Sequence, residues 1–126
     1  MLSIDIQRKA IEVAKASTSK KQVGALLLNR NKVVIAATNL ENKSHPIQAR
    51  FANKAGLREK IYLHAEIAAL IKCKEQADSI VVARVNCFND LRMAKPCPIC
   101  QLALREAGIN KVYYSTNSGF RFFNLK

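Results

Sequence analysis

The fold is decided by residues 62–107, which read YLHAEIAALIKCKEQADSIVVARVNCFNDLRMAKPCPICQLALREA. The spacing of apolar residues over 62–74 predicts a helix, and the β-branched run over 79–85 predicts a strand. Pro98 suits a first helical position and Gly108 suits a terminator, which together predict a second helix over 98–107. A helix, a strand and a helix in this order are typical of a layered α/β domain.

A further helix is predicted at the start of the chain, over residues 3–16. Ser3 suits its N-cap, because a hydroxyl there accepts a hydrogen bond from an unpaired N–H of the first turn. Ile4, Ile11 and Ala14 recur at helical spacing. We therefore expect these three residues to form one stripe that faces the core.

The remaining apolar runs complete a sheet. Residues 23–28 and 33–38 predict a hairpin, and their continuous hydrophobicity predicts a sheet covered on both faces. Residues 112–115 and 120–125 are separated by only a short turn, whereas parallel strands need a crossover of about a dozen residues or more. The last two strands must therefore be antiparallel. We predict an α/β domain of three layers, α/β/α, whose mixed five-stranded sheet ends in an antiparallel hairpin.

Residues 39–63 are too long for a bare loop in a compact domain. Pro46 as a first helical residue and Gly56 as a terminator predict a short helix between them. Such a helix places three basic residues at spacings of four, where like charges repel: Arg50, Lys54 and Arg58. This stripe is either solvated or faces an anion.

The composition excludes several classes of protein. The chain has 126 residues, 49% of them hydrophobic, which suits a single domain over 1–126 and is too apolar for a disordered chain. No apolar run approaches the ~20 residues of a membrane span, and the start lacks the pattern of a secretory signal. Four cysteines without such a signal are typical of reduced thiols or metal ligands. We expect a cytoplasmic protein with no membrane segment.

The charge balance points to anionic partners. Lys and Arg number 21 against 9 Asp and Glu, which gives a net charge of +12. A domain this basic attracts polyanions, and nucleic acid is the usual one. Charge alone does not distinguish nucleic acid from a small phosphorylated substrate, or either of them from a surface that is simply basic.

Two motifs carry the chemistry, His64-Ala65-Glu66 and Pro96-Cys97-Pro98-Ile99-Cys100, and each opens a predicted helix. Cysteines two residues apart at a helix start can point at one ion, and histidine is a ligand that zinc accepts. Three protein ligands leave an open position for water, which is the arrangement of catalytic zinc. The remaining candidate ligands are poorly placed, and we expect the two cysteines among them to be small buried residues: His45, to which no role is assigned, Cys73 and Cys87.

Glu66 lies in the first helical turn, close to the metal but not needed as a ligand. Zinc lowers the pKa of bound water towards 7, and a carboxylate beside it can take that proton and pass it on. The pattern H-x-E followed by P-C-x-x-C is the signature of zinc-dependent nucleobase deaminases, and the chain matches it at every fixed position.

On these motifs the chain resembles the cytidine deaminase superfamily, over residues 23–115. The resemblance implies one zinc per chain on His64, Cys97 and Cys100, with Glu66 as the proton shuttle. It also implies that Asn39 holds the sugar of the substrate, although Asn39 could equally be a turn residue, and that the N–H of Ala65 contacts the base. Histidine as first ligand resembles the deoxycytidylate, tRNA and polynucleotide branches more than the free-cytidine enzymes.

Two features depart from the family pattern. Many members carry Glu before the Pro-Cys, where this chain has Lys95, a positive charge at the rim of the site. The second departure is the predicted final hairpin, since the deoxycytidylate and tRNA enzymes have a helix and a parallel strand there. We expect Lys95, Arg50 and Lys54 to contact the substrate, together with Asn39 and Ala65.

The leading hypothesis is hydrolytic deamination at C4 of a cytosine, in a (deoxy)cytidine nucleotide or in single-stranded DNA or RNA. An adenosine deaminase acting on tRNA and a non-catalytic, zinc-containing module that binds nucleic acid are the alternatives. Seven basic residues lie near the motifs in the sequence, which is more than one phosphate can use. This number favours a polynucleotide, and the residues are Lys43, Arg50, Lys54, Arg58, Lys60, Arg92 and Lys95. Resemblance to relatives that share pocket walls between subunits leads us to expect a homo-oligomer.

Overall fold

The computed structural model describes residues 2–44, 46–56 and 62–125. Within them the helices and strands follow one another in this order: α1 (Ile4–Lys15), β1 (Gln22–Asn29), β2 (Lys32–Thr38), β3 (Leu40–Ser44), α2 (Pro46–Lys54), β4 (Tyr62–Leu63), α3 (Ala65–Lys72), β5 (Ser79–Val85), β6 (Leu91–Arg92), α4 (Pro98–Glu106), β7 (Lys111–Thr116) and β8 (Gly119–Asn124). His45, Arg58 and Lys60 lie outside the described residues.

The main sheet is mixed, as predicted. Its strand order is β2-β1-β5-β7-β8, with the two-residue β6 beside β5, so the described residues form six strands where five were expected. β5 and β7 are parallel, with α4 in the crossover between them, and the other strand pairs of this sheet are antiparallel. The final pair β7–β8 is the predicted antiparallel hairpin.

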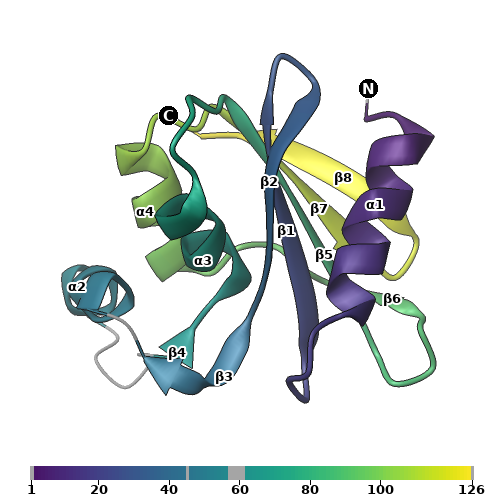
Figure 1. The fold of residues 1–126 in the computed structure, drawn as a ribbon, viewed down its shortest axis with the longest axis horizontal. Helices are drawn as coiled ribbons and strands as arrows, with labels where there is room; N and C mark the ends of the chain where they lie inside the picture. Colours follow the sequence, from purple (N-terminus) through teal and green to yellow (C-terminus); the bar gives the residue numbers. More distant parts are fainter. Residues whose placement is uncertain (1, 45, 57–61, 126) are drawn as a thin grey trace.

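Helices cover both faces of this sheet, which confirms the three layers. α1 lies on one face, and α2, α3 and α4 lie on the other (Figure 1). Each interface has its own apolar core. Leu27, Ile80 and Ile99 belong to the core beneath α3 and α4, whereas Leu26 and Val81 belong to the core beneath α1.

The helix α1 buries a different set of residues from the predicted stripe. Ala10 and Ala14 are fully buried, but Ile4 is 63% exposed, so its predicted place in the core is wrong. The reason is Gly24 on β1: a Cβ there would lie 2.5 Å from the backbone nitrogen of Ala14. With no side chain at Gly24, the small residues of α1 lie directly on the strand, and this close contact fixes which side of the helix is buried.

The segment between β2 and α3 differs from expectation at its ends. The predicted short helix is present as α2, but a small two-stranded sheet, β3–β4, frames it. Because β4 occupies Tyr62–Leu63, α3 begins at Ala65 and not at residue 62. Within the described residues, no helix combines the length and the apolar character that spanning a membrane requires.

Candidate active site

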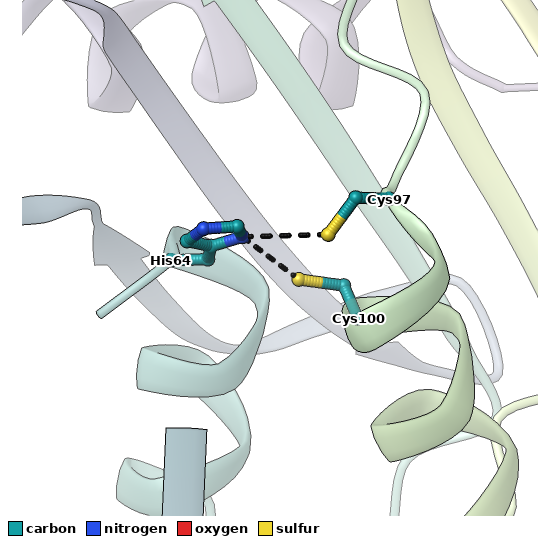
Figure 2. Close-up of side chains that lie close together, drawn as sticks. All are labelled: His64, Cys97 and Cys100. Atoms are coloured by element: carbon teal, nitrogen blue, oxygen red, sulfur yellow. Dashed lines mark hydrogen bonds between the residues drawn. The ribbon is translucent and has the colours of Figure 1, made fainter. Parts of the chain in front are cut away.

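The two sequence motifs meet where α3 and α4 begin. His64 is the N-cap of α3 and Cys97 is the N-cap of α4, both with extended backbone, and Pro98 starts α4 with a favoured residue. Neither N-cap side chain makes the usual capping hydrogen bond. Instead the imidazole of His64 and the thiols of Cys97 and Cys100 point towards one another (Figure 2).

The distances within this group suit a tetrahedral metal. Nδ1 of His64 lies 3.3 Å from Sγ of Cys100 and 3.6 Å from Sγ of Cys97, and the three ligand atoms lie within 4.8 Å of one another. For tetrahedral zinc, bonds of about 2.0–2.1 Å to nitrogen and about 2.3 Å to sulfur place the nitrogen ~3.6 Å from each sulfur. The donor atoms and their spacing therefore fit zinc, with Nδ1 as the histidine ligand.

The two thiols are electrostatically unequal. The pKa of Cys97 is lowered to about 4, chiefly by the hydrogen bond from Cys100 and also by His64, which together outweigh the opposing effect of burial. The same hydrogen bond and nearly complete burial raise the pKa of Cys100. Cys97 is thus a ready thiolate at the positive end of α4, while Cys100 keeps its proton until a cation displaces it.

Glu66 is buried beside the three ligand atoms. The residue is only 5% exposed and lies in the first turn of α3. Burial raises the pKa of its carboxyl, and the neighbouring charge of His64 opposes that rise. Within the described residues, the group of ligand atoms comprises His64, Cys97 and Cys100 and does not include Glu66. A carboxyl with a raised pKa next to a metal site is suited to taking up and releasing a proton.

Gln48 is a site residue that the sequence analysis missed. It is fully buried on α2, and its Oε1 accepts a hydrogen bond from the backbone N–H of His64 at 3.2 Å. The bond ties α2 to the residue that precedes α3. One signal was available, because Gln48 lies three residues before the buried Phe51 and so shares its inward face.

Asn39 follows β2 and ties together the loop that precedes β1. Its Oδ1 accepts hydrogen bonds from Ser17 Oγ at 2.7 Å and from Val23 N at 3.2 Å. Its Nδ2 donates to the carbonyl of Lys21 at 2.7 Å. These bonds give Asn39 a structural role, and contact with a substrate sugar stays a prediction.

The other predicted substrate contacts occupy different surroundings. Ala65 is buried as the first residue of α3, where a helix offers its N–H no acceptor of its own. Lys95 is exposed, and its Nζ lies 5.1 Å from the centre of the Phe123 ring. Both stay predictions as substrate contacts.

Arg50 and Lys54 face another helix and not the metal-ligand group. Arg50 lies 3.5 Å and Lys54 lies 2.7 Å from the carboxylate of Glu106, on α4. These two positive charges on one face of α2 thus share the carboxylate of Glu106 as their counter-charge. This pairing weakens the case for the two residues as substrate contacts, which remains a prediction.

The remaining cysteines stand apart from this site. Cys73 is half-buried and donates a hydrogen bond to the carbonyl of Glu75 at 3.1 Å. Cys87 is exposed, so the expectation that it is buried is wrong. It follows β5 in a turn, and the apolar run of that strand ends two residues before it.

Comparison with known proteins agrees with this geometry. The chain matches the family described as the cytidine and deoxycytidylate deaminase zinc-binding region over residues 3–116. No match was found among curated proteins. A dCMP deaminase from the cyanophage S-TIM5, solved with dCMP and dUMP, is similar in fold, with a TM-score of 0.54 and 21% identity over 90% of this chain and 83% of that chain. The apo form of that enzyme gives a TM-score of 0.51 and 20% identity over 89% and 83%.

Proposed function

Because the chain belongs to the family of the cytidine and deoxycytidylate deaminase zinc-binding region, we propose that it deaminates the cytosine of a pyrimidine nucleotide at the site built by His64, Glu66, Cys97 and Cys100. Membership of this family makes the protein a zinc-dependent deaminase of the cytidine or dCMP type, and hence a hydrolase. What we add is the assignment of residues and of substrate.

One observation carries the assignment of residues. A histidine nitrogen and two thiols converge at the starts of two helices, at spacings that suit tetrahedral zinc, beside a buried carboxyl. A purely structural zinc site has four protein ligands and no use for an unliganded carboxylate next to the metal. Three ligands and Glu66 are instead what a hydrolytic site requires.

His64, Cys97 and Cys100 would hold the zinc and leave its fourth position open. When bound there, zinc acts as a Lewis acid that lowers the pKa of a water molecule. Gln48 would hold the backbone of His64 in place through its N–H and so support the residue that carries the histidine ligand.

Glu66 would move the protons of the reaction. Its carboxylate takes a proton from the attacking water and delivers it to N3 of the cytosine while oxygen bonds to C4. A second proton then passes from the hydroxyl on C4 through Glu66 to the departing amino nitrogen. The C4–N4 bond then breaks, so that water and cytosine become uracil and ammonia. Burial raises the pKa of this carboxyl, which makes it a better proton acceptor from the water than an exposed glutamate would be.

The base and the sugar would be held by residues at the edges of this site. The N–H of Ala65 would face the base, Asn39 would contact the sugar, and Lys95 would place a positive charge at the rim. Asn39 has one amide hydrogen beyond the hydrogen bond that it donates to Lys21, which leaves a donor for a sugar hydroxyl.

A nucleotide is favoured over a polynucleotide. Of the seven basic residues that favoured a polynucleotide, Arg50 and Lys54 are paired with Glu106. The similar cyanophage enzyme was solved with dCMP and dUMP. The net charge of +12 supports the alternative, a single-stranded DNA or RNA substrate. A cytoplasmic location and a homo-oligomer remain predictions, and light scattering that shows only a 14.0 kDa species would contradict the second.

The test is ammonia release by zinc-loaded protein from a panel of dCMP, CMP, deoxycytidine, adenosine, single-stranded DNA, single-stranded RNA and tRNA. We expect turnover of the cytosine mononucleotides. Deamination of an oligonucleotide with no turnover of dCMP or CMP would contradict the nucleotide assignment. Release from adenosine or tRNA alone would contradict the choice of cytosine, and no release from any substrate would favour a module without catalysis.

A further inference from the structure

Two arginines face each other at the end of β5. Arg84 of β5 lies directly opposite Arg92 of β6, in register. Like charges directly opposite each other on neighbouring strands destabilise a sheet. Side chains alternate along a strand, so Arg84 lies on the same face as Ile80 and Val82, which pack in the core beneath α3 and α4. The pair therefore lies on the face of the sheet that carries the proposed active site.

Among the described residues, no acidic side chain neutralises either guanidinium. Within the residues that the structure describes, Arg84 and Arg92 form no ion pair. The Nε of Arg84 is buried and has no hydrogen-bond partner among the described residues, and a Nη atom of Arg92 reaches only the carbonyl of the adjacent Leu91, at 3.2 Å. A buried donor without an acceptor is costly, and charged donors are the most costly.

The backbones of the two arginines are clamped in place by one buried hydroxyl. The Oγ of Ser115, on β7, accepts a hydrogen bond from the N–H of Arg84 at 3.0 Å and donates one to the carbonyl of Arg92 at 2.7 Å. Ser115 is fully buried. The fold thus fixes the backbones of the two arginines side by side, so both side chains start from neighbouring positions on the same face of the sheet.

Strand register and chain connectivity relate the pair to two parts of the proposed active site. On its other edge Arg84 is opposite Val23 of β1, whose N–H is bonded by Asn39. Along the chain, the five residues from Arg92 to Cys97 span at most ~18 Å even when fully extended. The pair is therefore close in the fold to Asn39, which is expected to hold the sugar, and close in the chain to the metal ligand Cys97.

We infer that Arg84 and Arg92 form a binding site for a phosphate group, namely the phosphate monoester of the nucleotide substrate. Guanidinium groups present planar pairs of N–H donors that match phosphate oxygens, and an oxyanion supplies both the missing counter-charge and the missing acceptor. The identity of the phosphate rests on the proposed function, whereas the anion site itself does not.

Binding without turnover tests the site directly. In zinc-loaded Glu66→Gln protein, dUMP should bind at least tenfold more tightly than deoxyuridine by calorimetry. Adding Arg92→Gln should remove at least tenfold of that preference. The matched control is Arg8→Gln, which removes the same charge from an exposed position on α1, and it should keep the full preference. Equal losses in both variants would contradict the proposal, since they would reflect net charge alone.

A second variant and a second readout guard against misfolding. Arg84→Met removes the charge and keeps most of the bulk, and it should lose the same preference while retaining zinc. If it fails to fold, Arg92→Gln decides the matter, since Arg92 lies on a two-residue strand. Inorganic phosphate should raise the melting temperature of the wild type and of Arg8→Gln, but not that of Arg92→Gln. A rise of equal size in all three proteins would overturn the inference.

Turnover separates this proposal from the proposed function. In catalytically active protein, Arg92→Gln should lower the ratio of kcat/KM for dCMP to kcat/KM for deoxycytidine at least tenfold. Deamination with an unaltered ratio would overturn the phosphate site and leave the deaminase assignment intact. A protein that deaminates nothing, yet loses its preference for dUMP in Arg92→Gln, would retain the phosphate site and contradict the assigned reaction.

Discussion

The N-terminus of α1 and the N-termini of α3 and α4 are built in opposite ways. At the first, the Oγ of Ser3 accepts a hydrogen bond from the N–H of Ile6 at 3.2 Å. At the other two, the N-caps are His64 and Cys97, whose side chains do not cap their helices. An N-cap hydrogen bond is worth about 1 kcal/mol, so these two helix starts forgo that stabilisation.

The difference shows where the fold is organised for stability and where for chemistry. α1 covers its face of the sheet with small residues, and its start is closed by its own cap. The starts of α3 and α4 keep their positive ends directed at a common point, where they favour thiolate and any negative charge that develops there. Substitutions at the starts of α3 and α4 should therefore affect zinc and turnover, whereas a substitution at the start of α1 should affect stability alone.

The largest effect is expected from Cys97→Ser. Removing one of three ligands should abolish zinc binding and with it the turnover of any substrate, because the remaining His64 and Cys100 cannot complete the site. Metal analysis after dialysis checks the first effect, and ammonia release checks the second. Cys87→Ser is the matched control, since it replaces an exposed cysteine away from the site. Full zinc occupancy in Cys97→Ser would refute the ligand assignment.

The second largest effect is expected from Glu66→Gln. Turnover should fall by about 100-fold or more, which is the contribution of a positioned general acid and base. Zinc content and melting temperature should not fall, since the amide is isosteric and the metal keeps its ligands. Glu12→Gln, on the exposed side of α1, makes the same change of charge and should retain wild-type turnover. Equal rates in the two variants would mean that Glu66 moves no proton.

Gln48→Leu should have an intermediate effect at the site. It removes the acceptor of a part-buried hydrogen bond from the N–H of His64, which costs about 1 kcal/mol of stability. Loss of a supporting hydrogen bond should also weaken zinc binding ~10–100-fold, as measured by competition with a chelator. Gln76→Leu, at an exposed position, is the control. Unchanged zinc affinity in Gln48→Leu would show that His64 needs no support from α2.

The smallest effect is expected at the other end of the comparison. Ser3→Ala should lower the free energy of unfolding by about 1 kcal/mol and leave zinc content and turnover unaltered. Ser3→Asp should restore the lost stability, because aspartate caps a helix as well as serine does. Denaturant titration measures both variants. A loss of zinc in Ser3→Ala would mean that the two regions are coupled and that the contrast between them is false.

The sequence predicted best those features that depend on local pattern. The hairpin β1–β2 follows from two apolar runs, and the final antiparallel pair follows from the short turn before Gly119. The chemistry of the metal-ligand group was predictable because H-x-E and P-C-x-x-C place ligands at helix starts, where the side chains of Cys97 and Cys100 share one direction.

Features that depend on contacts distant in sequence were not predictable. The start of α3 was placed too early, because Tyr62–Leu63 pairs with β3 across α2. Ile4 was expected in the core. Because Gly24 has no side chain, α1 instead places its alanines against the sheet and leaves Ile4 exposed. The partner of Arg50 and Lys54 is Glu106, more than 50 residues away. No local pattern specifies any of these contacts.

We have proposed that His64, Cys97 and Cys100 hold one zinc ion and leave its fourth position to a water oxygen. X-ray absorption at the zinc edge of the loaded protein reports the number and type of these ligands. We expect two sulfur ligands at about 2.3 Å and two nitrogen or oxygen ligands at about 2.0–2.1 Å. Three or four sulfur ligands, or none, would contradict the proposal.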